Sequence, residues 1–324
     1  MAKEKILAVL DIGSNSNVLL VAKCSSNGTI EPINEVFAIT RLGKGITHSG
    51  VLSAEAIQYA LDVSKEMQDI ATHEGAEDLI ITTTSAVRNA QNKSEFLVKC
   101  HQRLNIFPQV LSGKEEAKFT YIGATYEIET DSPLLTVDIG GGSTEVAFGT
   151  KNIMVGAHSM NMGCVAVSEM FNIGKGEWIP QRLAAKRFIK KNMFSIVDDV
   201  HSWLSSRSPI VIASGGTATT FAAVLLKENV YDRKHINSVK VESKMLAVYA
   251  RQLSRMSLEE RIKVPGMEKE RAEILPAGLL ILSEFLRFFN FNDIRITANG
   301  LRYGVMKHYL QKYFWKKHIK SGLK

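Results

Sequence analysis

Long apolar segments are absent from this sequence. No run of about 18 or more apolar residues occurs, so we expect no transmembrane helix. The first apolar run, residues 6–10, is too short for the core of a signal peptide, and no small-residue cleavage site follows it. We therefore expect a cytoplasmic protein that is not attached to a membrane.

Cysteine is scarce as well. The three cysteines, Cys24, Cys100 and Cys164, lie far apart and form no C-x-x-C pair. This pattern argues against a disulfide framework and against a zinc site, and it fits reduced thiols in the cytoplasm. The eight histidines show no metal-ligand spacing either.

Acidic residues are missing after Asp293, although the whole chain carries a net charge of +7. From residue 302 on, its arginines and lysines are Arg302, Lys307, Lys312, Lys316, Lys317, Lys320 and Lys324. A basic tail attracts a polyanionic partner. A solubilising C-terminal helix would have the same composition, and the sequence leaves both interpretations open.

The 324 residues exceed the usual span of one hydrophobic core, which favours two domains. Short apolar runs alternate with helical periodicity, which is typical of an α/β protein. Strands are predicted at 6–10, 18–24, 79–83, 134–137 and 145–148. Ser53, Ser94 and Ser112 are each predicted to cap the start of a helix, and the third helix is expected to run to about Glu127.

An internal repeat organises the chain. The strand at 6–10 leads into Asp11-Ile12-Gly13 and a polar turn, and the strand at 134–137 leads into Asp138-Ile139-Gly140 and a second polar turn. Each turn is followed by another strand. The repeat predicts two related halves, with the boundary near residues 123–133.

The second turn is the strongest chemical signal. It comprises Gly140, Gly141, Gly142, Ser143 and Thr144, and it is flanked by Asp138 and Glu145. Glycines let the backbone approach a ligand, and successive N–H groups form a concave anion site. The flanking carboxylates can reach one Mg²⁺ ion, directly or through water. The alternative is a glycine-rich hairpin that binds nothing.

Two further turns resemble phosphate-binding loops. The first copy of the repeat offers Gly13, Ser14, Asn15 and Ser16, and a third turn offers Ser214, Gly215, Gly216 and Thr217. Each could instead be a capped structural turn. Arg88 and Arg271 lie in polar turns as well, where a guanidinium is suited to bidentate phosphate contact.

Two adjacent glutamates can be separated by spacing. Ser112 and Glu115 match the S-x-x-E capping box, which gives Glu115 a structural task. Glu116 points about 100° away around the helix and is left as a candidate general base. An ordinary solvated glutamate in the first turn of a helix remains the alternative for Glu116.

The ordered motifs resemble the exopolyphosphatase and guanosine pentaphosphate phosphohydrolase family over nearly the whole chain. They include AVLDIGSNS (8–16), RLGKG (41–45), TTSAVRNAQN (83–92), SGKEEA (112–117), VDIGGGSTE (137–145), ASGGTATT (213–220), PGMEKERAEILPAG (265–278) and NGLRYG (299–304). The chain is similar to the short, two-domain form of this family, without the C-terminal extension of long members.

The resemblance implies a fold and a site. The fold is the two-domain actin-like ATPase fold of the sugar kinase, Hsp70 and actin superfamily, which is ribonuclease H-like, with the active site in the inter-domain cleft. One domain would be 1–124 with the C-terminal helix 303–324, and the other 125–302. The family implies Glu116 as the catalytic base, Asp138 and Glu145 as Mg²⁺ ligands, and phosphate binding by the three loops, with Arg88 and Arg271 near the entering polyanion.

The implied reaction is removal of a terminal phosphate from inorganic polyphosphate, or from guanosine pentaphosphate of the stringent response. Many family members carry a basic residue where this chain has Val18, which points to a missing phosphate contact. The alternatives are a guanosine polyphosphate-binding regulator with little turnover and an ATP-dependent kinase of the superfamily. A homodimer is possible, and no specific nucleic acid partner is expected.

Overall fold

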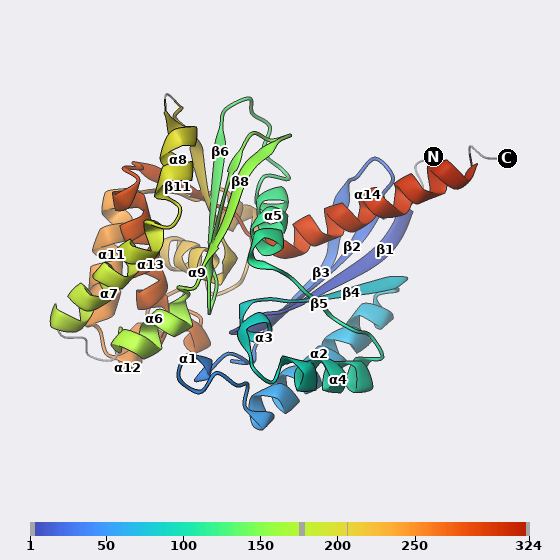
Figure 1. Cartoon of the computed structure of the whole chain (residues 1–324), viewed down its shortest axis with the longest axis horizontal. Helices are drawn as coiled ribbons and strands as arrows, with labels where there is room; N and C mark the ends of the chain where they lie inside the picture. Colours follow the sequence, from blue (N-terminus) through green and yellow to red (C-terminus); the bar gives the residue numbers. More distant parts are fainter. Residues whose placement is uncertain (1–3, 175–178, 206, 322–324) are drawn as a thin grey trace. The chain divides into compact units, whose positions relative to one another are not determined.

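A computed structural model describes residues 4–174, 179–205 and 207–321, with side chains to residue 312 (Figure 1). The chain divides into two compact units. Unit 1 comprises Met1–Tyr126 and Leu301–Lys324, and unit 2 comprises Glu127–Gly300. No helix in the described part of the chain is long and apolar enough to cross a membrane.

Unit 1 is built on a five-stranded sheet in the order β3-β2-β1-β4-β5. The strands are β1 (Glu4–Ile12), β2 (Ser16–Ser25), β3 (Ile30–Ile39), β4 (Asp78–Thr83) and β5 (Gln109–Val110). The first three are antiparallel, whereas β4 pairs parallel to β1 and β5 pairs parallel to β4. Residues 7–10 of β1 are fully buried, as expected for a central strand that is covered on both faces.

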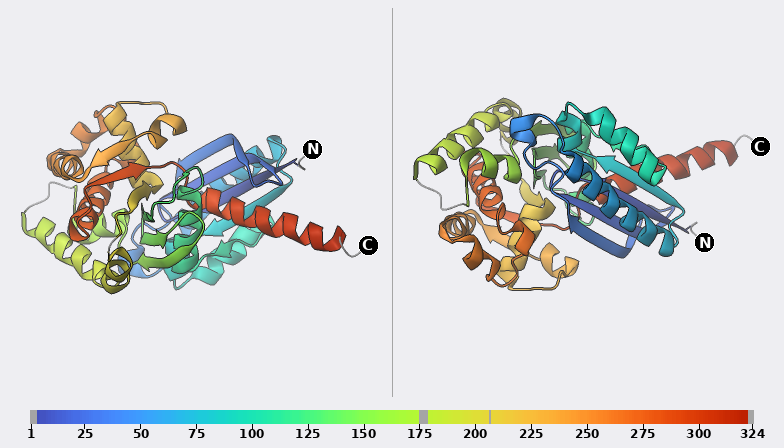
Figure 2. Two further views of the ribbon diagram at one scale, coloured as in Figure 1. Left: turned by 90° about the horizontal axis from the view of Figure 1, so that it is seen from above. Right: turned by 90° about the horizontal axis from the view of Figure 1, so that it is seen from below.

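Helices cover both faces of this sheet. The face that carries Ala8 and Leu10 packs against α2 (Ala54–His73) and α4 (Lys93–Leu104). The face that carries Leu7 and Val9 packs against α5 (Gly113–Ala124) and α14 (Leu301–Ser321). In Figures 1 and 2, α14 runs beside α5. Two short helices, α1 (Ile46–Ser49) and α3 (Ser85–Asn89), complete the unit.

The predicted helix starts are confirmed at two positions and wrong at the third. The Ser53 hydroxyl accepts from Ala56 N at the start of α2, and Ser112 and Glu115 form the complete capping box of α5. Helix α4, however, begins at Lys93, so Ser94 lies inside its first turn. Asn92 directly precedes α4, and its side-chain oxygen accepts from Leu52 N at 2.9 Å. The start of α4 is therefore fixed by a residue 40 positions away in the sequence.

Unit 2 repeats this plan with a six-stranded sheet in the order β10-β11-β9-β6-β7-β8. The strands are β6 (Leu134–Ile139), β7 (Thr144–Gly149), β8 (Met154–Met160), β9 (Ile210–Ser214), β10 (Lys240–Glu242) and β11 (Asp293–Ile296). The helices are α6 (Cys164–Phe171), α7 (Ile179–Met193), α8 (Val197–Leu204), α9 (Gly215–Leu226), α10 (Arg233–Asn237), α11 (Ser243–Arg255), α12 (Leu258–Ile262) and α13 (Leu275–Phe288), with a 3₁₀ turn at Lys269–Arg271. The buried helix α13 supplies much of the core of this unit.

The sequence repeat corresponds to a structural one. The β1–β2 hairpin and the β6–β7 hairpin are both antiparallel, and their first strands pair in parallel with β4 and β9, respectively. Both turns close in the same way: Gly13 N donates to Ser16 O at 2.9 Å, and Gly140 N donates to Ser143 O at 3.0 Å. The two halves therefore share one local geometry at the ends of their first strands.

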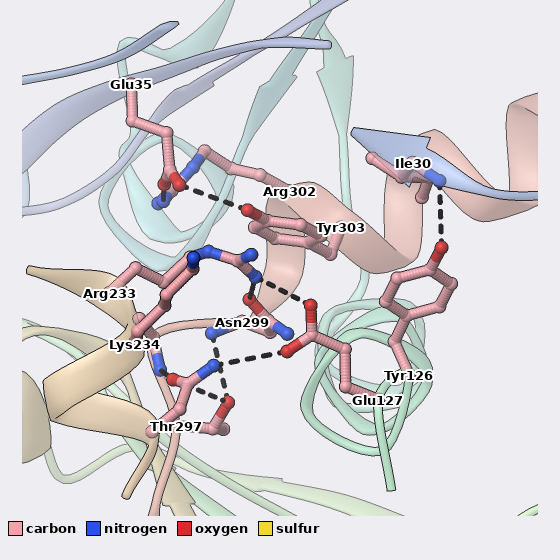
Figure 3. A network of polar contacts seen from close by, with 12 residues as sticks. Ile30, Glu35, Tyr126, Glu127, Arg233, Lys234, Thr297, Asn299, Arg302 and Tyr303 are labelled. Atoms are coloured by element: carbon pink, nitrogen blue, oxygen red, sulfur yellow. Dashed lines mark hydrogen bonds and ion pairs between the residues drawn. The ribbon is translucent and has the colours of Figure 1, made fainter. Parts of the chain in front are cut away.

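Polar contacts fix the chain within each unit where it passes from one unit to the other (Figure 3). In unit 1, Arg302 Nη2 and Tyr303 Oη donate to the Glu35 carboxylate at 2.9 and 3.0 Å. In unit 2, Arg233 Nη1 donates to Glu127 at 2.8 Å and to Asn299 at 2.9 Å.

The first two residues of the basic C-terminal segment are thus structural. Arg302 pairs with Glu35, and Lys307 Nζ donates to Gly28 O at 2.9 Å and lies over the Tyr126 ring. The sequence left open a polyanion-binding tail or a solubilising helix, and the structure shows that these two residues contact the rest of unit 1. Lys316, Lys317, Lys320 and Lys324 lie beyond the described side chains.

Candidate active site

Two carboxylates face each other across the first hairpin of unit 2. Asp138 of β6 is the register partner of Glu145 of β7, so their side chains project from the same face of the sheet. Ser214 Oγ donates to Asp138 Oδ2 at 2.8 Å, and Ser159 Oγ donates to Glu145 Oε1 at 2.6 Å. Hydroxyl donors therefore orient both carboxylates.

These residues form a continuous row across four strands. From β9 through β6 and β7 to β8, the row consists of Ser214, Asp138, Glu145 and Ser159. We call it the unit 2 row. Ser159 was not predicted, because it lies 14 residues beyond Glu145. The sequence patterns predict no strand at 154–160, and the position of Ser159 opposite Glu145 depends on the register that the turn between β7 and β8 sets.

The glycine turn beside this row is held by helix α6. Cys164 N donates to Gly140 O and Val165 N donates to Gly141 O, both at 2.9 Å. A Cβ at Gly163 would collide with the backbone of Gly141, so only glycine allows this approach. The carbonyls of the turn are thus engaged by α6.

The predicted phosphate-binding hydroxyls of this turn are those of Ser143 and Thr144. Ser143 and Thr144 are both buried, and Thr144 Oγ1 donates to Met162 O. Thr144 therefore holds the turn against the segment before α6.

The third predicted turn lies at the start of α9, next to Asp138. Gly215 has a φ of +78°, and a Cβ there would collide with the Asp138 carboxylate. A Cβ at Gly216 would collide with the Arg271 guanidinium. Thr217 Oγ1 donates to Ile139 O at 3.1 Å and ties the turn to β6. Unit 2 therefore brings this turn close to both Asp138 and Arg271.

Arg271 is a buried cation with a defined orientation. It is 8% exposed, and its Nε donates to Glu268 Oε2 at 2.9 Å. Thr220 Oγ1 donates to the other oxygen of the same carboxylate at 3.1 Å. Because this pair fixes the guanidinium over Gly216, its position against the first turn of α9 is preorganised.

In unit 1, buried polar groups at and beside the first loop differ in whether they have a hydrogen-bond partner. Ser14 Oγ accepts from Ala86 N at 3.1 Å, so this hydroxyl already has a partner. The Asn15 amide nitrogen, in contrast, has no hydrogen-bond partner among the described residues although Asn15 is only 7% exposed. The buried hydroxyl of Thr83, at the end of β4, also has no hydrogen-bond partner among the described residues. Such orphaned groups are rare and favour a ligand or water at this position.

Glu115 has the structural task predicted for it. Its Oε2 accepts from Ser112 N at 2.8 Å and from Ser112 Oγ at 2.7 Å. The hydroxyl and backbone N–H of Ser112 lower the pKa of Glu115, because both hydrogen bonds favour the charged form.

Glu116 is buried and ion-paired. Its side chain is 11% exposed, and its Oε2 lies 2.7 Å from Arg88 Nη1. Arg88, on α3, also donates to Leu111 O at 2.8 Å. The alternative of an ordinary solvated glutamate is therefore wrong for Glu116. Sequence spacing missed this pair because 28 residues separate its members.

The residues of unit 2 fit a magnesium ion. No group of three or more His, Cys, Asp or Glu side chains that could enclose a metal occurs in the described part of the chain. Mg²⁺ does not require such a cage, because it is usually held by one or two carboxylates together with water and substrate phosphates. Asp138 and Glu145 supply two hard oxygen donors, and Ser214 and Ser159 orient them.

Comparison with known proteins places the chain among phosphatases. Residues 20–313 match the Ppx/GppA phosphatase family. An exopolyphosphatase-like protein of known structure is 23% identical, with a TM-score of 0.88 over 96% of this chain and 99% of that chain. The Aquifex aeolicus family member is 25% identical, with a TM-score of 0.79 over 96% and 99% of the two chains.

An exopolyphosphatase from Cytophaga hutchinsonii is 23% identical, with a TM-score of 0.86 over 96% of this chain and 98% of that chain. These similarities extend over both units and agree with the repeated α/β architecture. The chain has the actin-like ATPase fold and belongs to the Ppx/GppA phosphatase family.

Proposed function

We propose that this protein is a Mg²⁺-dependent phosphohydrolase that removes the terminal phosphate of inorganic polyphosphate or guanosine pentaphosphate. The observation that carries the proposal is the unit 2 row, in which two facing carboxylates are oriented by serine hydroxyls beside a glycine turn. Membership of the phosphatase family supports the reaction class. The similar structure named an exopolyphosphatase supports the substrate class.

In this proposal, unit 2 holds the charged part of the substrate. Asp138 and Glu145 would hold Mg²⁺, which neutralises the charge that develops on the leaving phosphate oxygens. The glycine turn, through the backbone N–H groups of Gly141 and Gly142, and the first turn of α9 would donate to phosphate oxygens. Arg271, fixed by Glu268, adds a preorganised positive charge at α9.

The proposed general base is Glu116 of α5. The Glu116 carboxylate would accept the proton of the attacking water while the water oxygen bonds to the terminal phosphorus. The anhydride P–O bond then breaks, and its electron pair leaves with the shortened substrate. Arg88 holds Glu116 in one orientation through the contact at 2.7 Å and is itself tethered to Leu111 O.

The test is orthophosphate release from inorganic polyphosphate and from guanosine pentaphosphate at matched Mg²⁺, with no acceptor present. Release from at least one of them supports the hydrolase. Phosphate transfer that requires an added acceptor would indicate a kinase instead. Tight binding of guanosine tetraphosphate together with no release from either substrate would indicate a regulator and would contradict the proposal.

A further inference from the structure

A buried amide lies directly behind the first loop of unit 1, residues 13–16. Asn17, near the start of β2, is the register partner of Ile12 and is fully buried. Its Nδ2 donates to Ala60 O and to Ser64 Oγ of α2, both at 2.9 Å. Its Oδ1 accepts from Thr40 Oγ1 at 3.0 Å. The amide therefore joins β2, α2 and the end of β3.

The chemistry of its partners fixes the orientation of this amide. The Ala60 carbonyl oxygen can only accept, so the NH₂ group of Asn17 must face α2. The carbonyl oxygen of the amide then faces Thr40, whose hydroxyl must donate. Thr40 is only 3% exposed, so this hydrogen bond is shielded from water.

Thr40 begins a short segment that holds the first loop by its main chain. Thr40 N and Arg41 N donate to Asn15 O at 3.0 and 2.9 Å, and Gly43 N donates to Ser14 O at 2.7 Å. A Cβ at Gly43 would lie 3.1 Å from both the Cβ and the carbonyl oxygen of Ser14, so the two segments pack closely. We call residues 40–43 the clamp, because their N–H groups hold the carbonyl groups of the loop.

Unit 2 repeats this arrangement with a different side chain. Thr144 is the register partner of the isoleucine in the second Asp-Ile-Gly turn, as Asn17 is in the first. Its hydroxyl donates to Met162 O in the segment after β8, just as Asn17 contacts the segment after β3. N–H groups directly beyond Met162 then hold the carbonyls of the glycine turn. The same position thus fixes the turn in both halves of the repeat.

The clamp determines where the Asn15 side chain lies. The Asn15 carbonyl accepts two N–H groups, whereas its Nδ2 has no hydrogen-bond partner among the described residues and the residue is 7% exposed. A buried amide donor in this condition is rare, and it suits a phosphate oxygen, which can only accept. Binding groups must be held to within about 0.5 Å of their productive position. A displaced clamp would therefore displace this donor.

We infer that Asn17 and Thr40 are positioning residues, which set the first loop, and with it the Asn15 amide, for a phosphate group of the substrate. Both act through the main chain of the loop. The inference rests on the proposed function and adds to it two side chains that hold the binding loop in place.

The experiment separates two contacts of the same amide. Thr40→Val keeps the shape of the side chain and the backbone N–H but removes the hydroxyl that reaches Asn17. Ser64→Ala, the matched control, removes the hydroxyl that Asn17 contacts on α2. Both variants should lower Tm to a similar extent, because each leaves one polar group of the amide without its partner. Only Thr40→Val should lower kcat/KM for phosphate release, roughly three- to tenfold and mostly through KM, and Thr40→Ser should restore it.

Hydrogen exchange of the Thr40 and Arg41 amides gives a second readout that needs no substrate. Exchange should be faster in Thr40→Val than in the wild type or in Ser64→Ala. A wild-type kcat/KM in Thr40→Val, or an equal loss in Ser64→Ala, would overturn the inference while leaving the hydrolase intact. No release from either substrate by the wild type would overturn the proposed function, whereas the exchange rates would still show whether the Thr40 hydroxyl holds the loop.

Discussion

The adjacent glutamates of α5 give the sharpest test of residue roles. Glu116→Gln keeps the shape of the side chain and an oxygen that can still accept from Arg88, but it removes the basic carboxylate. A positioned general base contributes about 10²–10⁴-fold to the rate, which corresponds to roughly 3–5 kcal/mol of transition-state stabilisation. We therefore expect kcat to fall by that factor.

The effect on stability should be small by comparison. The pair with Arg88 is mostly buried, at 11% and 18% side-chain exposure, so replacing a charge-assisted hydrogen bond by a neutral one costs about 1 kcal/mol. For a unit of this size that corresponds to a fall in Tm of roughly 2–4 °C. Substrate binding should be kept, since the lost charge is negative and the substrate is a polyanion.

Glu115→Gln is the matched control, because glutamine also serves at the third position of a capping box. It should keep most of the activity. The assay is steady-state phosphate release together with thermal melting and substrate affinity for both variants. The assignment is refuted if Glu115→Gln is the inactive variant, or if both variants turn over at the wild-type rate.

Three further outcomes follow from the structure. Hydrogen bonds from Ser112 lower the pKa of Glu115 from its usual 4.5. The contact therefore stabilises the fold above about pH 4.5, and this stabilisation is lost as the pH falls through the lowered pKa of the folded protein. The Tm difference between wild type and Ser112→Ala should shrink in acid for this reason. Arg302→Ala removes the cation that pairs with the largely buried Glu35 carboxylate. Urea unfolding should show that the free energy of unfolding falls by about 1–3 kcal/mol. An unchanged urea midpoint would mean that Arg302 is only part of a basic surface. Burial raises the pKa of Cys100 to about 12, so iodoacetamide at pH 8 should label it only after denaturation, as mass spectrometry can show.

Local patterns in the sequence predicted much of the fold. The repeated Asp-Ile-Gly turns identified the two hairpins, because a turn after an apolar strand is encoded by neighbouring residues. The capping box at Ser112 was equally local. Ser94 was misjudged as a cap, since the start of α4 is fixed by Asn92 and its contact with Leu52, 40 residues away.

The groups that complete the candidate sites were harder to predict, because each reaches its partner through strand register or across a long sequence separation. Arg88 contacts Glu116 from another helix, and Ser159 contacts Glu145 from an adjacent strand. The composition after Asp293 left open a polyanion-binding tail or a solubilising C-terminal helix. The structure instead commits Arg302 to a carboxylate on β3, a pairing 267 residues apart that no local pattern indicates.

The most direct test of the account is a Mg²⁺ titration of phosphate release for the wild type and Asp138→Asn. Asparagine keeps an oxygen that can accept from Ser214, so the hairpin should fold normally while one metal-binding charge is lost. The account predicts that wild-type release stops in excess chelator and returns with added Mg²⁺. It predicts that Asp138→Asn needs roughly ten- to hundredfold more Mg²⁺ for half-maximal activity or loses activity altogether. Full release by the wild type in excess chelator, or an unchanged Mg²⁺ requirement in Asp138→Asn, would contradict it.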